Sequence, residues 1–423
     1  MTERNDGSGV RAGRRINRRD FLKMSGAGLA GAALLGASGC GGGGGGSGNI
    51  VFSMGPDDPG NTYTKLVDKF NEQHKGEFQA GGGDIDVIGG DTIWPIQFAA
   101  QGWVQDLSDN FPEPEQNKFL PAPINASIYE DGIYAVPWFE DAGLLYSRVD
   151  LLEQAGYSAP PETWDELKEM AIKTAQDTGT KYGFLFQGAN YEGGVCNALE
   201  YIRTHGGDVL SDVTSGEVII DSPEAAAGLE TYRSMITSGA APQAVSNYEE
   251  TEGDPLFENG ESVFFREWPG VYGDIGTGKF KVKQDQVAVS PIPVDPGNQS
   301  SSTLGGWTFM INAQTDMPDE AWEFVKFMTS FESFKYRAIE GGYITARKAI
   351  LDDPEVQKAI PTVKLAKDVL LDYATSRPVT QYYGDMSLEM QSEFNDALTG
   401  DVTPQQAVET LQKNLTTIMK QAD

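Results

Sequence analysis

Five short apolar runs have the composition of buried β-strands. They are rich in valine, isoleucine and phenylalanine, and polar or glycine-containing segments separate them. The five runs are NIVFSM (49–54), DIDVIGG (84–90), SVFFRE (262–267), QVAVSPIP (286–293) and WTFMIN (307–312). Continuous apolar runs of this length predict strands that are covered on both faces of a sheet.

Amphipathic segments alternate with these strands, and several of them begin with clear capping residues. Thr163 is followed three residues later by Glu166, which is the spacing of a capping box. Ser222 and Thr403 each precede a proline, which suits the first position of a helix. Residues 317–342 predict one long helix that ends at a pair of glycines. Strands separated by helices predict an α/β protein with parallel or mixed sheets.

The N-terminal segment has the order of an export signal. Residues 18–23, RRDFLK, resemble the twin-arginine motif, and a short apolar region follows at 29–35. That region is too short and too rich in glycine to span a bilayer as a stable helix. Residues 37–40, ASGC, resemble a lipobox, which implies cleavage before Cys40 and lipid attachment to Cys40. A plain signal peptide with an incidental cysteine is the alternative. Residues 41–48 then predict a flexible tether.

Removal of residues 1–39 changes the charge balance of the chain. The whole chain of 423 residues has 32 basic and 62 acidic residues, and the removed segment holds seven and three of them. The remaining 384 residues, enough for two domains, therefore carry 25 basic and 59 acidic residues, a net charge of −34. Such a surface repels nucleic acid and anionic lipid headgroups, which favours a neutral or cationic ligand. Acidity alone also keeps an exported protein soluble.

The cysteines and histidines exclude several chemistries. Cys196 has no partner once Cys40 carries lipid, so we expect no intrachain disulfide in the mature chain. The two histidines, His74 and His205, leave little material for a zinc site or a histidine-based triad. We therefore expect no metal and no cofactor.

The tract from Tyr134 to Ala171, YAVPWFEDAGLLYSRVDLLEQAGYSAPPETWDELKEMA, resembles family 1 extracellular solute-binding proteins of ABC importers. The closer resemblance is to trehalose/maltose-binding lipoproteins. Four further tracts follow the family order along most of residues 84–423: DIDVIGGDTIWPIQFAAQGWVQDLSD (84–109), LFENGESVFFREWPGVY (256–272), GGWTFMINAQTDMPDEAWEFVKFM (305–328) and SRPVTQYYGDM (376–386).

The resemblance implies a fold and a function. The fold is the two-lobe periplasmic-binding-protein fold, a type II Venus flytrap with hinge crossovers. We expect lobe 1 to hold residues 49–140 plus 304–340, and lobe 2 to hold 141–303 plus 341–423. The implied protein is a monomer that captures a neutral disaccharide outside the cell, performs no covalent chemistry, and delivers the sugar to a membrane permease.

Three carboxylates are expected at the ligand. Carboxylates accept paired hydrogen bonds from neighbouring sugar hydroxyls. The family pattern places Asp141 on the sugar, and it makes Asp91, at a strand end, a second acceptor. Capping of the following helix is the alternative for Asp91. Adjacent residues on a strand point to opposite faces, so Glu140 is either a further ligand contact or one partner of a hinge ion pair.

Aromatic residues and one arginine complete the expected site. Trp268 and Trp307 match aromatic platforms of the family, although a tryptophan without context is more often a core residue. Trp268 lies beside Pro269-Gly270 and Trp307 follows Gly305-Gly306, so both are expected in tight, irregular backbone that a ligand can approach closely. Arg377 matches an arginine that reaches the sugar, with a surface salt bridge as the alternative. Tyr382 and Tyr383 are weaker candidates.

The chain departs from its apparent relatives in one region. Relatives have a second strand and helix before the Asp91 strand, whereas here residues 75–84 join the flanking elements almost directly. About two dozen expected residues are missing, in comparison with ordinary βαβ units. The sequence leaves open whether lobe 1 is trimmed or the sequence itself is defective.

Two other functions fit parts of the pattern. A secreted glycosidase could use Glu140 with Asp91 or Asp141 as paired carboxylates, although adjacent residues are poorly placed for this. A binding protein of the same fold could instead take a longer oligosaccharide or a polyol.

Overall fold

The first of two sheets gathers strands from three distant parts of the chain. The computed structural model describes residues 50–54, 61–74, 85–214 and 216–420. The strands of this sheet are β1 (Phe52–Ser53), β2 (Val87–Asp91), β5 (Val136–Ala142), β10 (Ser302–Ile311) and β11 (Ala374–Thr375). β10 is central, because it pairs antiparallel with both β2 and β5 and parallel with β11. β1 extends the sheet by parallel pairing with β2.

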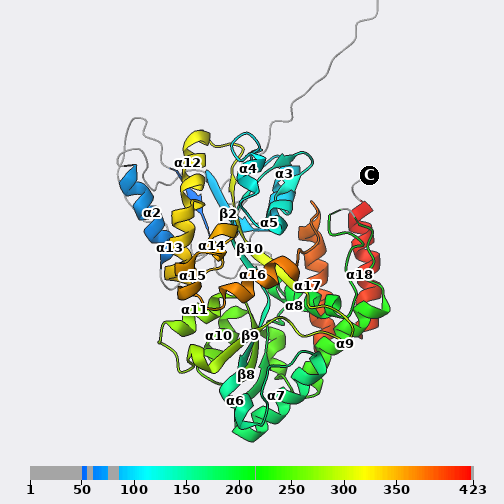
Figure 1. The fold of residues 1–423 in the computed structure, drawn as a ribbon. Helices are drawn as coiled ribbons and strands as arrows, with labels where there is room; N and C mark the ends of the chain where they lie inside the picture. The colour runs from blue at the N-terminus through cyan, green and yellow to red at the C-terminus, as the bar shows by residue number, and fades with distance from the viewer. Residues whose placement is uncertain (1–49, 55–60, 75–84, 215, 421–423) are drawn as a thin grey trace, which may run out of the picture.

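A second sheet lies in the other half of the molecule (Figure 1). Its order is β7-β8-β6-β9. The strands are β6 (Leu144–Arg148), β7 (Tyr182–Leu185), β8 (Ser262–Glu267) and β9 (Val287–Ser290), and a separate hairpin joins β3 (Ile128–Tyr129) to β4 (Gly132–Ile133). β7 pairs parallel with β8, and β6 pairs antiparallel with β8 and β9. The two sheets therefore mix parallel and antiparallel strands.

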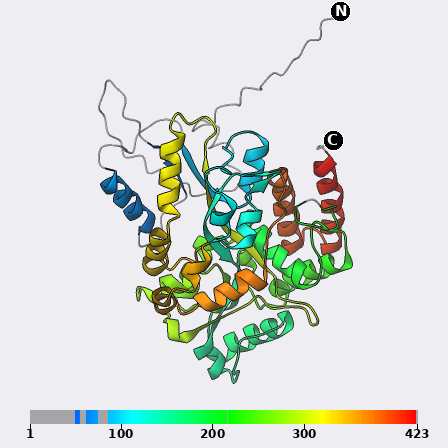
Figure 2. The same ribbon diagram turned by 45° about the horizontal axis from the view of Figure 1, so that its top comes forward.

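The helices near the first sheet come from two parts of the chain, one before β5 and one after β10. α2 lies beside α12 and α13, as two views of the ribbon show (Figures 1 and 2). α16 packs against β5, β10 and β11. The helices of this half are α2 (Thr62–Gln73), α3 (Trp94–Ala100), α4 (Glu113–Gln116), α5 (Pro121–Asn125), α12 (Pro318–Met328), α13 (Phe331–Gly341), α14 (Lys348–Leu351), α15 (Pro354–Ala359) and α16 (Val363–Asp372).

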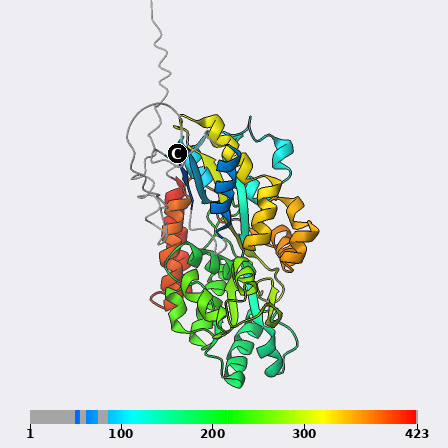
Figure 3. The same cartoon turned by 90° about the vertical axis from the view of Figure 1, so that its left-hand side faces the viewer.

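The helices of the other half form two groups. α6, α7 and α10 pack on the second sheet, whereas α8, α9, α17 and α18 pack on one another. Their bounds are α6 (Val149–Gln154), α7 (Trp164–Thr178), α8 (Glu192–Thr204), α9 (Pro223–Thr237), α10 (Glu250–Glu258), α11 (Gly270–Gly276), α17 (Tyr383–Thr399) and α18 (Pro404–Met419), with 3-10 turns at Gln243–Asn247 and Gln284–Gln286. Figure 3 shows the two halves one above the other, with α18, in red, along one side.

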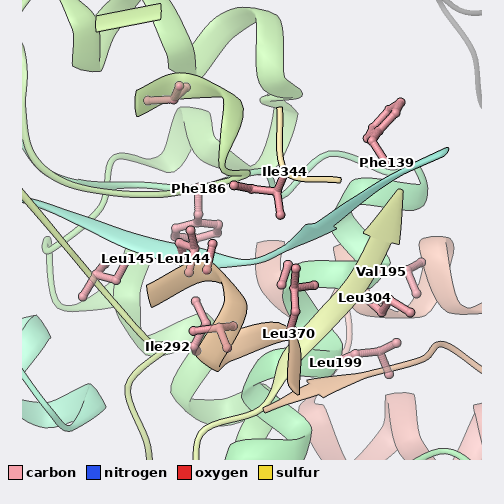
Figure 4. Close-up of a cluster of buried hydrophobic side chains, with 14 of the residues drawn as sticks. Phe139, Leu144, Leu145, Phe186, Val195, Leu199, Ile292, Leu304, Ile344 and Leu370 are labelled. Carbon is pink, nitrogen blue, oxygen red and sulfur yellow. The ribbon is translucent and has the colours of Figure 1, made fainter. Parts of the chain in front are cut away.

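The chain crosses from the first sheet to the second at Gly143. This glycine is the single residue between β5 and β6. A β-carbon there would lie 2.0 Å from Oε1 of Glu200 and 2.4 Å from Nη2 of Arg266, so a side chain at this position would displace the buried Glu200–Arg266 ion pair. Buried apolar side chains from β5, β6, β10, α8 and α16 gather around this crossing (Figure 4). The crossover is therefore a packed junction rather than an open linker.

The division into lobes stays a prediction. α14 contacts α13 and α16, and α15 contacts α13. These contacts place residues after 341 beside α13, which itself packs on α2. The expected boundary at 341 would instead assign these residues to lobe 2.

Most elements predicted from the sequence are present. All five apolar runs contain strands, and 262–267 coincides with β8. Thr163, Ser222 and Thr403 cap their helices through their side chains, with full capping boxes at Thr163 and Thr403. The predicted long helix at 317–342 is wrong, because it divides into α12 and α13. Ser330 accepts a hydrogen bond from the backbone N–H of Ser333 and so begins a new helix.

Several predictions fall outside the described residues. The export signal, Cys40 with its lipid, the tether and the short segment 75–84 lie there. Within the described residues, no helix has both the length and the apolar character needed to cross a membrane.

Candidate functional site

β10 brings the predicted site residues together. Trp307 lies opposite Asp91 of β2, whereas Gly306 and Gly305 lie opposite Glu140 and Asp141 of β5. Three consecutive residues of one strand therefore align with three carboxylates from two neighbouring strands. The strand continues through the glycine pair, which the sequence suggested to be irregular, and its register shifts between Trp307 and Thr308.

Asp91 and Arg377 form an ion pair. Nη2 of Arg377 lies 2.5 Å from Oδ1 of Asp91, and Nη1 lies 3.3 Å from Oδ2. Arg377 is 3% exposed, so the alternative of a surface salt bridge is wrong: the pair is largely buried. Asp91 also accepts a hydrogen bond from the backbone N–H of Ile93 at 3.1 Å. Its carboxylate therefore holds the turn before α3, whose N-cap is Ile93, and binds Arg377 at the same time.

Arg377 has a second carboxylate partner, which the sequence reasoning missed. Nη1 of Arg377 donates to Oε1 of Glu192 at 2.8 Å. The hydroxyl of Tyr383 donates to the same oxygen at 2.5 Å, and the hydroxyl of Ser387 donates to Oε2. Tyr383, a weaker candidate from the sequence, is buried in this network. No spacing signal in the sequence links Glu192 to residues nearly 200 positions away.

Asp141 and Trp268 meet at Gly305. A β-carbon on Gly305 would lie 3.2 Å from the Trp268 ring and 3.4 Å from Cβ of Asp141, so the missing side chain makes room for both. The indole N–H of Trp268 donates to Glu250 at 3.1 Å, and the guanidinium of Arg266 lies 4.2 Å from the ring centroid. These contacts fix the plane of the indole and leave it half-buried.

The Asp141 carboxyl is desolvated. Its pKa is raised to about 7, mainly by burial, and the negative charges of Asp91 and Glu250 contribute to the rise. The positive charges of Arg337 and Arg266 act in the opposite direction. A carboxyl with a pKa near 7 is destabilised as an anion, so donors from a ligand would stabilise it.

Glu140 lies on the opposite side of β5. It is fully buried, and neither carboxylate oxygen has a hydrogen-bond partner among the described residues. Burial raises the pKa of Glu140 well above its usual range, and the charges of Asp141 and Asp91 raise it further, which favours the neutral acid. The hinge ion pair considered for Glu140 is absent from the described residues.

Gly306 is required by the backbone at this point. Its φ is +113°, and a β-carbon there would lie 2.3 Å from the carbonyl oxygen of Phe139 and 3.0 Å from Cα of Glu140. Any side chain at Gly306 would therefore separate β10 from β5.

Trp307 belongs to an aromatic group beside the ion pair. Its ring lies nearly parallel to that of Phe139, at 15° and with a centroid distance of 6.5 Å. The guanidinium of Arg337 lies 3.7 Å from the Trp138 ring centroid and 3.8 Å from that of Tyr343. Trp307 remains half-buried, so part of its face is accessible.

The two halves meet again at a pair of glycines. A β-carbon on Gly273 of α11 would lie 3.2 Å from Cα of Gly342, which ends α13. A cavity of about 350 Å³ lies at this junction. Its lining includes Tyr272, Gly273, Lys279, Glu340, Gly342 and Ile360.

These residue types suit recognition of a ligand with hydroxyl groups and apolar faces. The site offers carboxylate acceptors, a forked donor and flat apolar rings. The thiol of Cys196 is buried, and burial raises its pKa to about 12, so it is a poor nucleophile. No group of three or more potential metal ligands is present in the described part of the chain.

Comparisons with known proteins agree with a role in ligand binding. The profile described as bacterial extracellular solute-binding protein matches residues 59–333, and the twin-arginine translocation signal profile matches residues 15–36. A probable ABC transporter-binding protein of Deinococcus radiodurans is 34% identical over 372 residues, which cover 85% of this chain and 87% of the relative.

Solved structures are similar over most of the chain. The maltose-bound MalE3 of T. maritima is 35% identical, with a TM-score of 0.81, and the match covers 88% of this chain and 99% of that one. The GacH receptor of Streptomyces glaucescens, solved unliganded and with acarbose, has a TM-score of 0.78 over the same shares of the two chains. Its identity of 20% supports the fold alone.

Proposed function

The chain belongs to the bacterial extracellular solute-binding proteins, and we propose that it captures a neutral disaccharide of the trehalose or maltose type for an ABC permease. One observation carries the proposal: β10 aligns Trp307, Gly306 and Gly305 with Asp91, Glu140 and Asp141. Asp91 pairs with Arg377, and Gly305 leaves room for the Trp268 ring beside Asp141, so six of the seven expected residues form one array, whereas Glu140 is fully buried on the other side of β5.

The residue types favour a sugar. Vicinal hydroxyls can donate to Asp91 and Asp141, and the half-buried rings of Trp268 and Trp307 can cover apolar C–H faces. Relatives support the class: besides the maltose-bound MalE3, a maltotriose-binding protein of Pyrococcus abyssi is 27% identical over 62% of this chain.

We infer that the sugar binds between two lobes that close by hinge motion. The first sheet provides Asp91 and Trp307, and the loop after β8 provides Trp268. The crossing at Gly143 follows two residues after Asp141. Closure would dry the carboxylates, and each unpaired group would then oppose binding of the wrong sugar.

We also propose that the protein is exported and held at the outer face of the membrane by lipid on Cys40. The twin-arginine match at 15–36 supports export, and four small residues separate the apolar region from the cysteine. The glycine-rich residues 41–48 would let a monomer reach its permease.

A thermal-shift panel tests the sugar class. Trehalose, maltose, maltotriose, mannitol and glucose are compared with the chain lacking residues 1–39. A ligand present at 100 times its Kd adds about 2.7 kcal/mol of stability, which gives a clear shift in Tm. Stabilisation by mannitol alone would replace the disaccharide with a polyol, the alternative ligand of the same fold.

The same samples test the glycosidase alternative. A retaining glycosidase needs two solvent-accessible carboxyls about 5–5.5 Å apart, and Glu140 is fully buried. We therefore expect no glucose release from trehalose or maltose during prolonged incubation with pure protein. Steady release at a rate proportional to protein concentration would establish an enzyme instead.

A further inference from the structure

Glu192 joins Arg377 to the group of helices formed by α8, α9, α17 and α18. It lies in the first turn of α8, and its side chain is 19% exposed. Its carboxylate accepts hydrogen bonds from Arg377, Tyr383 and Ser387. Two of these partners come from α17, so the carboxylate is held by the packing of α8 against α17.

The backbone around Arg377 is held by hydrogen bonds to the same part of the molecule. Arg203 of α8 donates to the carbonyl oxygens of Thr375 at 3.2 Å and Ser376 at 2.8 Å. The backbone N–H of Val379 donates to the carbonyl of Val213. Arg377 therefore starts from a segment anchored on α8, whereas its guanidinium reaches Asp91 at the end of β2.

The guanidinium therefore contacts residues of both expected lobes, which a hinge motion would separate. Nη1 contacts both Glu192 and Asp91, and Nη2 contacts Asp91 and the Thr92 hydroxyl. Without Glu192, the long arginine side chain would lose its fixed direction whenever Asp91 moved away. Ordering a flexible arginine at the moment of closure opposes binding.

We propose that Glu192 is a positioning residue for ligand binding. It holds the Arg377 fork ready in the open form, so that closure around the sugar brings Asp91 to a donor that is already oriented. This inference rests on the proposed sugar-binding function and adds a residue to it that need not touch the sugar.

A merely structural role makes a different prediction. If Glu192 only joins α8 to α17, its loss should lower stability and should weaken binding whether or not Arg377 is present. If it acts through Arg377, its effect on sugar affinity should disappear once Arg377 is removed. A double-mutant cycle on affinity separates these cases.

The experiment is calorimetric titration of maltose or trehalose, whichever the native chain binds, into four proteins: native, Glu192→Gln, Arg377→Gln and the double variant. Glu192→Gln should raise Kd about tenfold, as for loss of one hydrogen bond to a charged group. In the Arg377→Gln background the same change should raise Kd less than about twofold. Glu389→Gln on α17, whose carboxylate instead accepts from Asn414, is the matched control and should bind as the native chain does.

Two results would overturn the proposal: native affinity of Glu192→Gln, or an equal tenfold loss in both backgrounds. Glu192→Asp, which keeps the charge at shorter reach, enters the same cycle if the amide variant does not fold. A native chain that binds no sugar is a separate result, because it contradicts the proposed function before the cycle begins.

Discussion

Asp141→Asn tests whether the carboxylate at the lobe crossing is desolvated before any ligand arrives. Burial raises the pKa of Asp141 to about 7 in the folded protein, from 3.8 for an ordinary aspartate. Below pH 3.8 the group is protonated in both folded and unfolded chains. As the pH rises toward 7, the unfolded chain loses its proton first, so the folded state loses stability. Asparagine does not titrate and escapes this loss.

The magnitude follows from the separation of the two pKa values. At about 1.4 kcal/mol for each pH unit between them, the full effect is about 4 kcal/mol above pH 7. Between pH 5 and pH 8, the free energy of unfolding of Asp141→Asn minus that of the native chain should rise by about 2.5–3 kcal/mol. Both pH values lie above the isoelectric point of about 4.3, so both proteins should stay soluble.

The assay is urea unfolding of the unliganded proteins, followed by tryptophan fluorescence, at pH 5, 6, 7 and 8. Sugar titration at pH 8 accompanies it. We expect a more stable variant at pH 8 that binds sugar about 10- to 150-fold more weakly, because one charged acceptor has become a donor. A stability difference that does not change with pH would refute the reasoning, since Asp141 would then titrate as a solvated group.

Four further substitutions have defined outcomes. Trp268→Ala and Trp307→Ala should each weaken sugar binding by about 1–3 kcal/mol in titration calorimetry, and normal binding with easy unfolding would assign both to the core. Gly273→Ala adds a methyl group 3.2 Å from Cα of Gly342. It should hinder closure and raise Kd while leaving the Tm of the unliganded protein within about 2 °C of the native value. An unchanged Kd would show that the two glycines need not touch in the bound form. Cys40→Ser should move the protein from the membrane fraction to the soluble fraction of its host, and equal retention of both forms would exclude a lipid anchor.

Local signals predicted the elements of the fold well. Capping residues and proline positions act over one helical turn, so Thr163, Ser222 and Thr403 identified helix starts correctly. Ser330 is a capping residue of the same kind, but the apolar periodicity continues across it. The sequence therefore predicted one helix where the structure has α12 and α13. The predicted strand began at Trp307, after the glycine pair 305–306, and so omitted the first half of β10.

The site could be predicted as a set of residues but not as an arrangement. The alignment of Trp307 with Asp91 depends on pairing between strands more than 200 residues apart, and nothing local fixes that register. Glu192 was missed for the same reason, because its role depends on where α8 meets α17. The burial of Glu140 also depends on the whole junction rather than on its neighbours in sequence.

Calorimetric titration of the native chain, without residues 1–39, tests the central claim most directly. Trehalose and maltose are titrated separately at pH 7.5, with mannitol and buffer as controls. We predict saturable binding of at least one of the two disaccharides with a stoichiometry of about one per chain, accompanied by a change in tryptophan fluorescence from the rings beside β10. Absence of heat and of any fluorescence change with both disaccharides, in protein shown to be folded, would contradict the account.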